Sequence, residues 1–451
     1  MNTDMKPTDM KPTDMKPTDM KNITVDIVDS TPELSLQCAT IQNVYESGSP
    51  KPDLKLAPKP TQLAIDLLTE DEVRRIRGTV IDNRTKRVVH PGGFFPYEFT
   101  EIDREKFDQK TTELHQNFND MTVGYSFEGT IIRIFYHNKW YVSTHRKLDA
   151  NRSKWGSDKS FKTLFESGLQ DSYGLTLQQL INRLNLRCHY TFMVMADANT
   201  RFVCEVGDGK KVYLVGTNDP APSVNIDPLP VPNVKFETVD CVFNYVKEMT
   251  YPFAYQGLLL VHRSGSQYRV INSEYGKLFQ VRNNEQSIPF RYLQLKTENA
   301  SETIDNLKKL FPTYIPIFEQ QDVYVDQLAD FIHVEYTKRK QNNPIGPIDQ
   351  HIYLFIKNRL MQHRNVFTKN QIKEILWSEK PSYLNQMIRL IKYQNSKKEQ
   401  TKLVVEFDKI DLSPKSLSPK SDLTVLNAPK KKKVKYIQIP VSITCRKQLF
   451  K

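Results

Sequence analysis

The stretch that decides the fold is Gly124-Tyr-Ser-Phe-Glu-Gly-Thr-Ile-Ile-Arg-Ile-Phe-Tyr136. From Gly129 onward it is a run of β-branched and aromatic residues, which is typical of a β-strand. Residues 140–144 form a second run of this kind, and the polar residues His137-Asn-Lys139 separate the two. The sequence therefore predicts a β-hairpin at this point of the chain.

Further short runs of strand-forming residues alternate with helical patterns. Strands are predicted at residues 190–196, 202–206 and 212–215. Helices are predicted at residues 177–184, with a cap at Thr176, and at residues 239–249. Many short antiparallel strands with interspersed helices are typical of an α+β domain and not of a doubly wound parallel sheet.

The charge of the chain is concentrated near its end. The formal net charge is +12, and residues 396–451 hold fourteen Lys or Arg and five Asp or Glu, a net of +9, which leaves +3 for the rest. This tail predicts electrostatic affinity for nucleic acid, whereas the body is nearly neutral. Since no run of about eighteen apolar residues occurs and the first twenty residues are polar, neither a membrane span nor a secretory signal is predicted. Five widely spaced cysteines predict reduced thiols rather than disulfides or zinc.

Composition and periodicity divide the chain into four parts. Thr3-Asp-Met-Lys-Pro7 begins a repeat that runs through Lys21 and, because of its prolines, cannot form a helix or a ladder. Helices with one apolar face are predicted at residues 304–311, 325–332, 352–361 and 369–376. The predicted parts are residues 1–60, a disordered low-complexity repeat and linker with one strand at 23–28; 61–300, the α+β domain; 301–395, a helical C-terminal module; and 396–451, a basic, mostly flexible tail.

Several segments follow one another in the order of a known family. These are Arg77-Gly-Thr-Val-Ile-Asp82, Val88-Val-His-Pro91, Phe94-Phe-Pro-Tyr-Glu-Phe99 and Ser126-Phe-Glu-Gly-Thr130. They resemble the phage-type RNA ligases, in which the lysine of K-x-(D/E)-G-(S/T) attacks the α-phosphate of a nucleotide. By this resemblance Arg77 is the arginine near the nucleotide phosphates, and Glu128, Gly129 and Thr130 are the acid, glycine and hydroxyl of the motif. Ser126 stands in place of the nucleophilic lysine.

Downstream segments continue the resemblance with altered chemical groups. Tyr190-Thr-Phe-Met-Val-Met195 is similar to the third ligase motif, with Met193 or Val194 in place of its carboxylate. Tyr255-Gln256-Gly257 is similar to the fourth motif, E-G-h-V, with Gln256 in place of the acid. Tyr268-Arg269-Val270-Ile271 stands where two lysines of K-x-K neutralise triphosphate, and it offers Arg269 alone. The segment 268–296 resembles ligase-like proteins of the large nucleocytoplasmic DNA viruses.

A second register supplies a lysine. Lys147-Leu-Asp-Ala-Asn-Arg152 resembles the K-x-D-G-x-R of DNA ligases and capping enzymes, with Ala150 in place of the glycine. In this register Lys147 is the catalytic nucleophile. In the first register Arg146, Lys147, Arg152 and Lys154 instead hold phosphates without chemistry. The sequence leaves both open.

Residues 290–295 also have two interpretations. The alternation of Phe290, Tyr292, Leu293 and Leu295 predicts a core strand. Alternatively, Arg291 and Tyr292 contact a nucleic-acid backbone or stack on a base.

The resemblance implies a nucleotidyltransferase core of the ATP-grasp-like type found in ligase adenylation domains, with antiparallel sheets flanked by helices. The leading hypothesis is a catalytically impaired RNA ligase-like protein of a giant DNA virus that binds nucleic acid or nucleotide without self-nucleotidylation. The first alternative is an active ATP-dependent RNA or DNA ligase, or a capping-type nucleotidyltransferase, that uses Lys147, ATP and Mg²⁺. The second alternative is a structural or virion protein.

Partners, location and site residues follow from the leading hypothesis. The expected partners are RNA or DNA, together with viral proteins that bind the helical C-terminal module, and no membrane. The expected location is the host cytoplasm, the viral factory or the virion, and Pro429-Lys-Lys-Lys-Lys-Val-Lys435 resembles a nuclear localisation signal. No metal ligand is predicted. The residues expected to bind nucleotide or phosphate are Arg77, Ser126, Glu128, Gly129, Thr130, Arg146, Arg152, Gln256 and Arg269.

Overall fold

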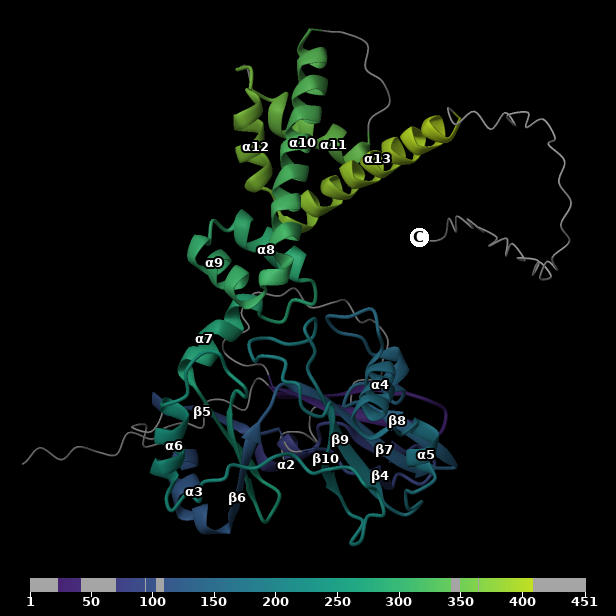
Figure 1. Ribbon diagram of the computed structural model, residues 1–451, viewed down its shortest axis with the longest axis vertical. Coiled ribbons are helices and arrows are strands. Elements are labelled where there is room, and N and C mark those ends of the chain that lie inside the picture. Colours follow the sequence, from purple (N-terminus) through teal and green to yellow (C-terminus); the bar gives the residue numbers. More distant parts are fainter. Residues whose placement is uncertain are drawn as a thin grey trace, which may run out of the picture. The chain divides into compact units, whose positions relative to one another are not determined.

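A computed structural model describes residues 23–41, 70–93, 95–102, 109–341, 349–363 and 365–408 (Figure 1). Contacts divide the chain into two units, Met1–Tyr393 and Gln394–Lys451. Of the second unit, the described residues 394–408 are the end of helix α13 (Pro381–Asp408). The first unit contains three four-stranded sheets together with helices, which confirms the predicted α+β class.

Sheet A is formed by β1 (Ile23–Ser30), β2 (Leu34–Ile41), β3 (Thr79–Asp82) and β4 (Val88–His90), in that order and antiparallel throughout. The strand expected at 23–28 is present as β1. The second strand, β2, was not predicted, because the Pro- and Ser-rich composition around it indicated a linker. Its alternation of buried Leu34, Leu36 and Cys38 is the pattern of a half-buried strand.

Sheet C has the order β10-β9-β7-β8 and contains the predicted hairpin. Its strands are β7 (Gly129–His137), β8 (Lys139–Ser143), β9 (His189–Met195) and β10 (Val212–Thr217). One face, which includes Ile132, Ile134 and Phe192, packs against α4 (Phe161–Tyr173) and α5 (Leu177–Ile181) (Figure 1). The cap predicted at Thr176 is confirmed, since its hydroxyl accepts a hydrogen bond from the amide of Gln179.

Sheet B has the order β5-β12-β11-β6, with β5 parallel to β12 and the other pairs antiparallel. Its strands are β5 (Tyr97–Thr100), β6 (Met121–Ser126), β11 (Gly257–His262) and β12 (Gln267–Ile271). Buried side chains on one face pack against α6 (Val239–Lys247) and α3 (Gln109–Gln116). The opposite face carries, in register, Glu98, Arg269, Leu259 and Gly124.

The remaining helices follow sheet B along the chain, and they confirm the four helices predicted after residue 300. They are α7 (Ser273–Arg282), α8 (Ile288–Thr297), α9 (Ser301–Leu310), α10 (Ile315–Lys340), α11 (Gln350–Phe355), the π-helix η6 (Ile356–Leu360) and α12 (Lys369–Trp377). The shorter elements elsewhere are α2 (Glu70–Arg75) and the 3₁₀-helices η3 (Phe118–Asp120), η4 (Ala150–Arg152) and η5 (Pro312–Tyr314). No described helix combines the length and the apolar composition that a membrane span needs. The predicted domain boundaries remain predictions.

Two predicted strands are wrong. Residues 290–295 lie in helix α8, which begins after the capping residue Ser287, and its buried Ile288, Tyr292 and Leu295 have helical spacing. Residues 202–206 form no strand, because the backbone amides at 202–204 donate to a side-chain carboxylate instead of a neighbouring strand.

Candidate functional site

The segment Ser126-Phe-Glu128 connects sheet B to sheet C. Ser126 ends β6 and is 4% exposed, and it pairs with Gly257, which in turn pairs with Ile271. The main chain of Gln256 donates to the Ser126 carbonyl, and its side-chain amide donates to the carbonyl of Phe127 at 2.9 Å. The positions that resemble three separate ligase motifs therefore lie together at one end of sheet B.

Glu128 has a structural role that the sequence did not indicate. Its buried carboxylate accepts hydrogen bonds from the amides of Phe202, Val203 and Cys204 at 2.6–3.0 Å. A fourth bond, of 2.8 Å, comes from the hydroxyl of Tyr275 on α7. Burial and then the Glu128 charge raise the pKa of Tyr275 well above its usual value, so this hydroxyl stays protonated and donates. Both carboxylate oxygens are thus engaged within the protein.

Gly129 and Thr130 also serve the packing of β7. A Cβ at Gly129 would lie 2.5 Å from the carbonyl oxygen of Val194, so only glycine fits against β9 here. Thr130 pairs with Val194, on the face of β7 that includes buried Ile132 and Ile134. The structure therefore does not bring the Thr130 side chain to the face that carries Arg133.

The Glu128→Ala substitution should destabilise the fold. It leaves three backbone amides and one hydroxyl without their buried acceptor, and we expect a loss of about 3 kcal/mol in the free energy of unfolding. Urea denaturation followed by circular dichroism measures this loss. The exposed Glu205→Ala is the matched control and should stay within about 0.5 kcal/mol of the wild type. Equal stability of the two variants would contradict the structural role of Glu128.

Four arginines from three sheets form a group that we name the arginine cluster: Arg77, Arg133, Arg146 and Arg269. Arg77 precedes β3, Arg133 lies in β7, Arg146 follows β8, and Arg269 lies in β12. Burial is the largest cause that lowers the pKa of Arg77, and the charges of Arg269 and Arg146 lower it further. Burial and the Arg77 charge lower the pKa of Arg133 to about 10. Arg77 therefore lies close enough to each of the other three arginines for their positive charges to repel.

Arg133 is the most constrained member of the arginine cluster. It is 3% exposed, and its guanidinium donates to the carbonyl oxygens of Gly78 and Thr144. Its Nε has no partner in the part of the chain that the structure describes. Arg133 was not among the predicted site residues, although a charged residue within the apolar run Ile131-Ile-Arg-Ile134 is a usable signal.

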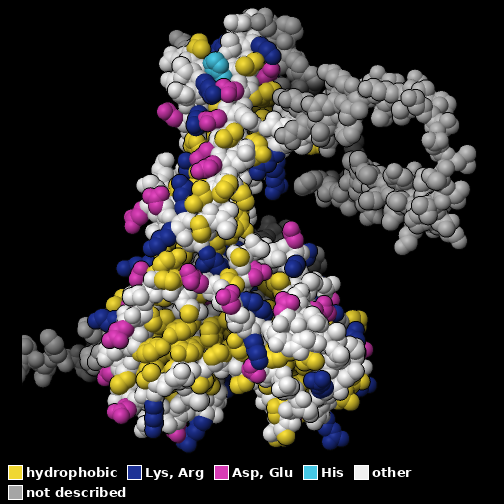
Figure 2. Space-filling view, in the orientation of Figure 1, with side chains coloured by type: hydrophobic (Ala, Val, Ile, Leu, Met, Phe, Trp, Pro, Cys, Tyr) yellow, Lys and Arg dark blue, Asp and Glu magenta, His cyan; other side chains and the backbone are white. Residues whose placement is uncertain are grey.

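The arginine cluster carries a surplus of positive charge. Among the described residues, Glu98 is the one carboxylate that pairs with a member, at 3.0 Å from Arg269. The thiol of Cys38 lies in the same region, but burial raises its pKa, so it supplies no negative charge. On the face shown in Figure 2, Lys and Arg are interspersed with Asp and Glu. The unbalanced charge of the arginine cluster favours an anion there.

The pKa of His145 is lowered by burial and by the positive charge of the arginine cluster. Its ring is half-buried, and burial, followed by the charges of Arg77, Arg146 and Arg133, lowers its pKa to about 3. His90 behaves similarly, because burial and then Arg133 lower its pKa to about 3. Both rings are neutral near pH 7.

An anion bound at the arginine cluster should raise the pKa of His145. A nearby negative charge offsets the arginine charges and favours the imidazolium form, so the titration midpoint should rise from about 3 towards 6.5. NMR of the His145 ring protons with and without sodium tripolyphosphate measures this shift. In Arg146→Ala, which removes one repelling charge, the midpoint should be higher even without ligand. A midpoint that tripolyphosphate leaves unchanged would argue against an anion beside His145.

Lys147 and Arg152 lie beside an acid on β1. The Lys147 ammonium is 4.0 Å and the Arg152 guanidinium 3.2 Å from Asp29, whose other carboxylate oxygen accepts the amide of Leu148. Thus Lys147 has a carboxylate partner, whereas its neighbour Arg146 belongs to the arginine cluster. The catalytic role of Lys147 remains a prediction.

The strand register distinguishes Met193 from Val194, the two residues at the position where the resemblance expects the carboxylate of the third motif. Met193 pairs with Ile131 and lies on the same face of sheet C as Arg133, whereas Val194 is 6% exposed and belongs to the opposite, core face. The described residues contain no group of three or more His, Cys, Asp or Glu side chains that could hold a metal ion.

Comparison with known proteins finds relatives of this chain in two invertebrate iridescent viruses. No family model matches the chain. The chain is 47% identical over 437 residues to the "Immediate-early protein ICP-46 homolog" of Invertebrate iridescent virus 3, which covers 94% of this chain and 97% of the relative. It is 29% identical over 337 residues to the protein of the same description from Invertebrate iridescent virus 6, which covers 65% of this chain and 73% of the relative. The viral source of both agrees with the viral origin expected from the sequence. The chain belongs to the family of immediate-early protein ICP-46 homologues.

Proposed function

We propose that this protein binds the phosphate groups of a nucleotide or nucleic acid at the arginine cluster, on a degenerate nucleotidyltransferase fold, without forming a covalent nucleotidyl intermediate. The observation that carries the proposal is the surplus charge of Arg77, Arg133 and Arg146, with which no carboxylate of the described residues forms an ion pair. Because half-buried and buried cations repel one another, a bound anion stabilises this arrangement.

The number of charges favours a terminal phosphate or a polyphosphate. Four arginines face one paired carboxylate, so three positive charges remain unbalanced. A phosphodiester carries one negative charge, whereas a nucleotide di- or triphosphate carries several. Guanidinium groups also match phosphate oxygens in geometry, with two parallel N–H donors. We therefore expect a nucleoside polyphosphate or a phosphorylated end of RNA or DNA as the ligand.

Support for the nucleotidyltransferase core comes from the register of the sheets. The strand pairs Ser126–Gly257 and Gly257–Ile271 join positions that resemble the K-x-(D/E)-G-(S/T), E-G-h-V and K-x-K segments of the ligases. The pair Ile131–Met193 adds the third motif in sheet C. Segments up to about 145 residues apart in the sequence are thus paired in the sheets. Their order along the chain is that of the ligase motifs that they resemble.

The chemical groups at these positions do not favour nucleotidyl transfer. A serine hydroxyl needs a base before it can attack a phosphate, and within the described residues no side chain that could act as this base hydrogen-bonds to the Ser126 hydroxyl. Glu128 is occupied by four donors inside the protein. Met193 and Gln256 provide no carboxylate oxygen, which is the ligand that Mg²⁺ prefers. Binding should therefore require no metal ion.

Binding of sodium tripolyphosphate in EDTA, measured by isothermal titration calorimetry, tests this proposal. The wild type should bind, and Arg146→Ala should weaken the affinity roughly tenfold, or about 1.4 kcal/mol, since one charge-assisted contact is lost. Arg146 is exposed, so its removal should preserve the circular dichroism spectrum. Arg84→Ala, at an exposed position in the turn between β3 and β4, is the matched control and should bind like the wild type.

The other outcomes separate the alternatives. Binding of ATP that strictly requires Mg²⁺ would favour the active ligase that uses Lys147. Absence of binding with and without Mg²⁺ would favour a structural or virion protein. An equal loss in Arg84→Ala and Arg146→Ala would indicate binding by general surface charge.

The tail extends the proposal to nucleic acid. Residues 409–451 lie outside the described residues and hold eleven Lys or Arg and two Asp or Glu, a net of +9. We propose that they add a sequence-independent electrostatic contribution to nucleic-acid binding. We also propose that the run Pro429-Lys-Lys-Lys-Lys-Val-Lys435 is a nuclear targeting signal. The other proposed locations are the host cytoplasm, the viral factory and the virion.

A further inference from the structure

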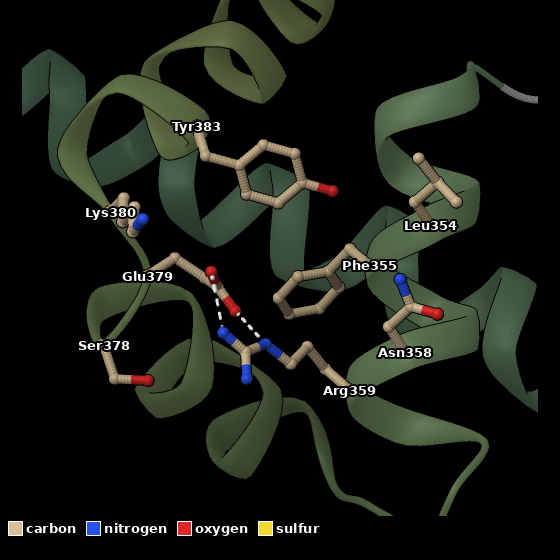
Figure 3. Close-up of a pocket in the computed structure, with 8 residues that line it drawn as sticks. All are labelled: Leu354, Phe355, Asn358, Arg359, Ser378, Glu379, Lys380 and Tyr383. Atoms are coloured by element: carbon tan, nitrogen blue, oxygen red, sulfur yellow. Dashed lines mark hydrogen bonds and ion pairs between the residues drawn. The ribbon is translucent and has the colours of Figure 1, made fainter.

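A pocket of about 560 Å³ lies in the helical part of the first unit (Figure 3). It is formed by the end of α11, the π-helix η6, and the start of α13. Its lining residues, drawn in Figure 3, are Leu354, Phe355, Asn358, Arg359, Ser378, Glu379, Lys380 and Tyr383. Its volume is within the roughly 300–1,000 Å³ typical of sites that enclose a small ligand or side chain. None of these residues belongs to the arginine cluster.

Apolar side chains form the interior of this pocket. Phe355 is 1% exposed, whereas Leu354 is 36% exposed and remains accessible. Figure 3 shows these two side chains and the ring of Tyr383 around one open space. The Tyr383 hydroxyl donates to the carbonyl of His351 at 2.6 Å, which fixes the ring as a wall. The pocket is therefore formed before any ligand enters.

A charged pair fixes the opposite wall. The guanidinium of Arg359 donates to both carboxylate oxygens of Glu379, at 2.5 and 3.3 Å. Glu379 is 7% exposed and Arg359 is 58% exposed at the side chain, so the acid is covered while the cation faces outward. The π-helical turn that carries Arg359 is of a kind frequently found at functional sites.

The rim is positively charged. Glu379 is neutralised by Arg359, and the exposed Lys380 of the lining adds a positive charge that pairs with no carboxylate among the described residues. An apolar pocket beside Lys380 and the outward face of Arg359 fits an apolar side chain with acidic neighbours, because opposite charges steer and orient a partner. A phosphate backbone fits less well, since it offers nothing to cover Leu354 and Phe355.

We propose that this pocket is a docking site for an acidic peptide segment of a partner protein, with a Leu or aromatic side chain of that segment inserted between Leu354, Phe355 and Tyr383. Acidic residues on either side of the inserted side chain then lie near Lys380 and the outward face of Arg359. This inference does not rest on phosphate binding at the arginine cluster.

A positional library of the peptides Ac-Asp-Glu-X-X-Asp-Glu-NH₂ tests the docking site, with fluorescence anisotropy of labelled members against the full chain. Members with Leu, Phe, Tyr or Trp at X should bind best. Replacing the acidic flanking residues with lysine should weaken binding roughly tenfold or more, because the attraction to the cations is lost. Replacing both X positions with glycine should weaken it by a similar factor, because the inserted side chain is lost.

Variants of the protein locate the binding. Lys380→Glu and Leu354→Asp should each weaken the best peptide roughly tenfold, whereas the matched controls Lys277→Glu on α7 and Val334→Asp on α10, both exposed, should not. Circular dichroism checks that all four are folded. The proposal is overturned if no library member binds, if lysine-flanked peptides bind equally well, or if the pocket variants behave like their controls.

Discussion

The buried carboxylate of Glu128 is the interaction on which the arrangement of the sheets and of α7 depends. It joins the start of β7 to the amides of residues 202–204 and to Tyr275 on α7. The same loop continues the connection, because Arg201 donates to the carbonyl of Leu310 at the end of α9. Since a buried carboxylate is costly without such donors, the sheets and the first helices after them form one hydrogen-bonded system.

This constraint also limits the chemistry of the site. A carboxylate that is engaged by four internal donors has no free oxygen for a nucleotide or a metal ion. The groups that remain next to the motif positions are cations and apolar side chains, among them Arg269 and Met193. Arg133 is buried without an acid, an arrangement that costs free energy until an anion is nearby. These features support the proposal that the site binds phosphate without nucleotidyl transfer.

Local patterns predicted much of the fold. The hairpin of β7 and β8, the capped helix α5 and the helices after residue 300 carry their own signals, namely strand-forming runs, capping residues and helical spacing. The errors arose where local signals are ambiguous. The apolar positions within residues 288–295 fit the period of a strand as well as that of a helix. Pro289 in the first turn of α8 and the capping residue Ser287 favour the helix. In β2 apolar and polar residues alternate, but the Pro- and Ser-rich sequence on either side indicated a linker.

The candidate site could be predicted only in part, because it depends on pairing between distant strands. The sequence pointed to Arg77, Arg146 and Arg269 separately, and strand register then showed that Met193 rather than Val194 lies on the same face as Arg133. Neither the engagement of Glu128 nor the isolation of Arg133 has a local signature. Both arise from the approach of segments more than fifty residues apart.

The central claim is that the fold holds phosphate without forming a bond to it, and one measurement tests it most directly. The full chain is incubated with ATP or GTP radiolabelled at the α-phosphate, with Mg²⁺ or Mn²⁺, and then separated by denaturing electrophoresis. The account predicts no covalent label in the wild type or in Lys147→Ala. A labelled band in the wild type that disappears in Lys147→Ala would contradict it, because a phosphoramide bond to lysine is the intermediate of an active nucleotidyltransferase.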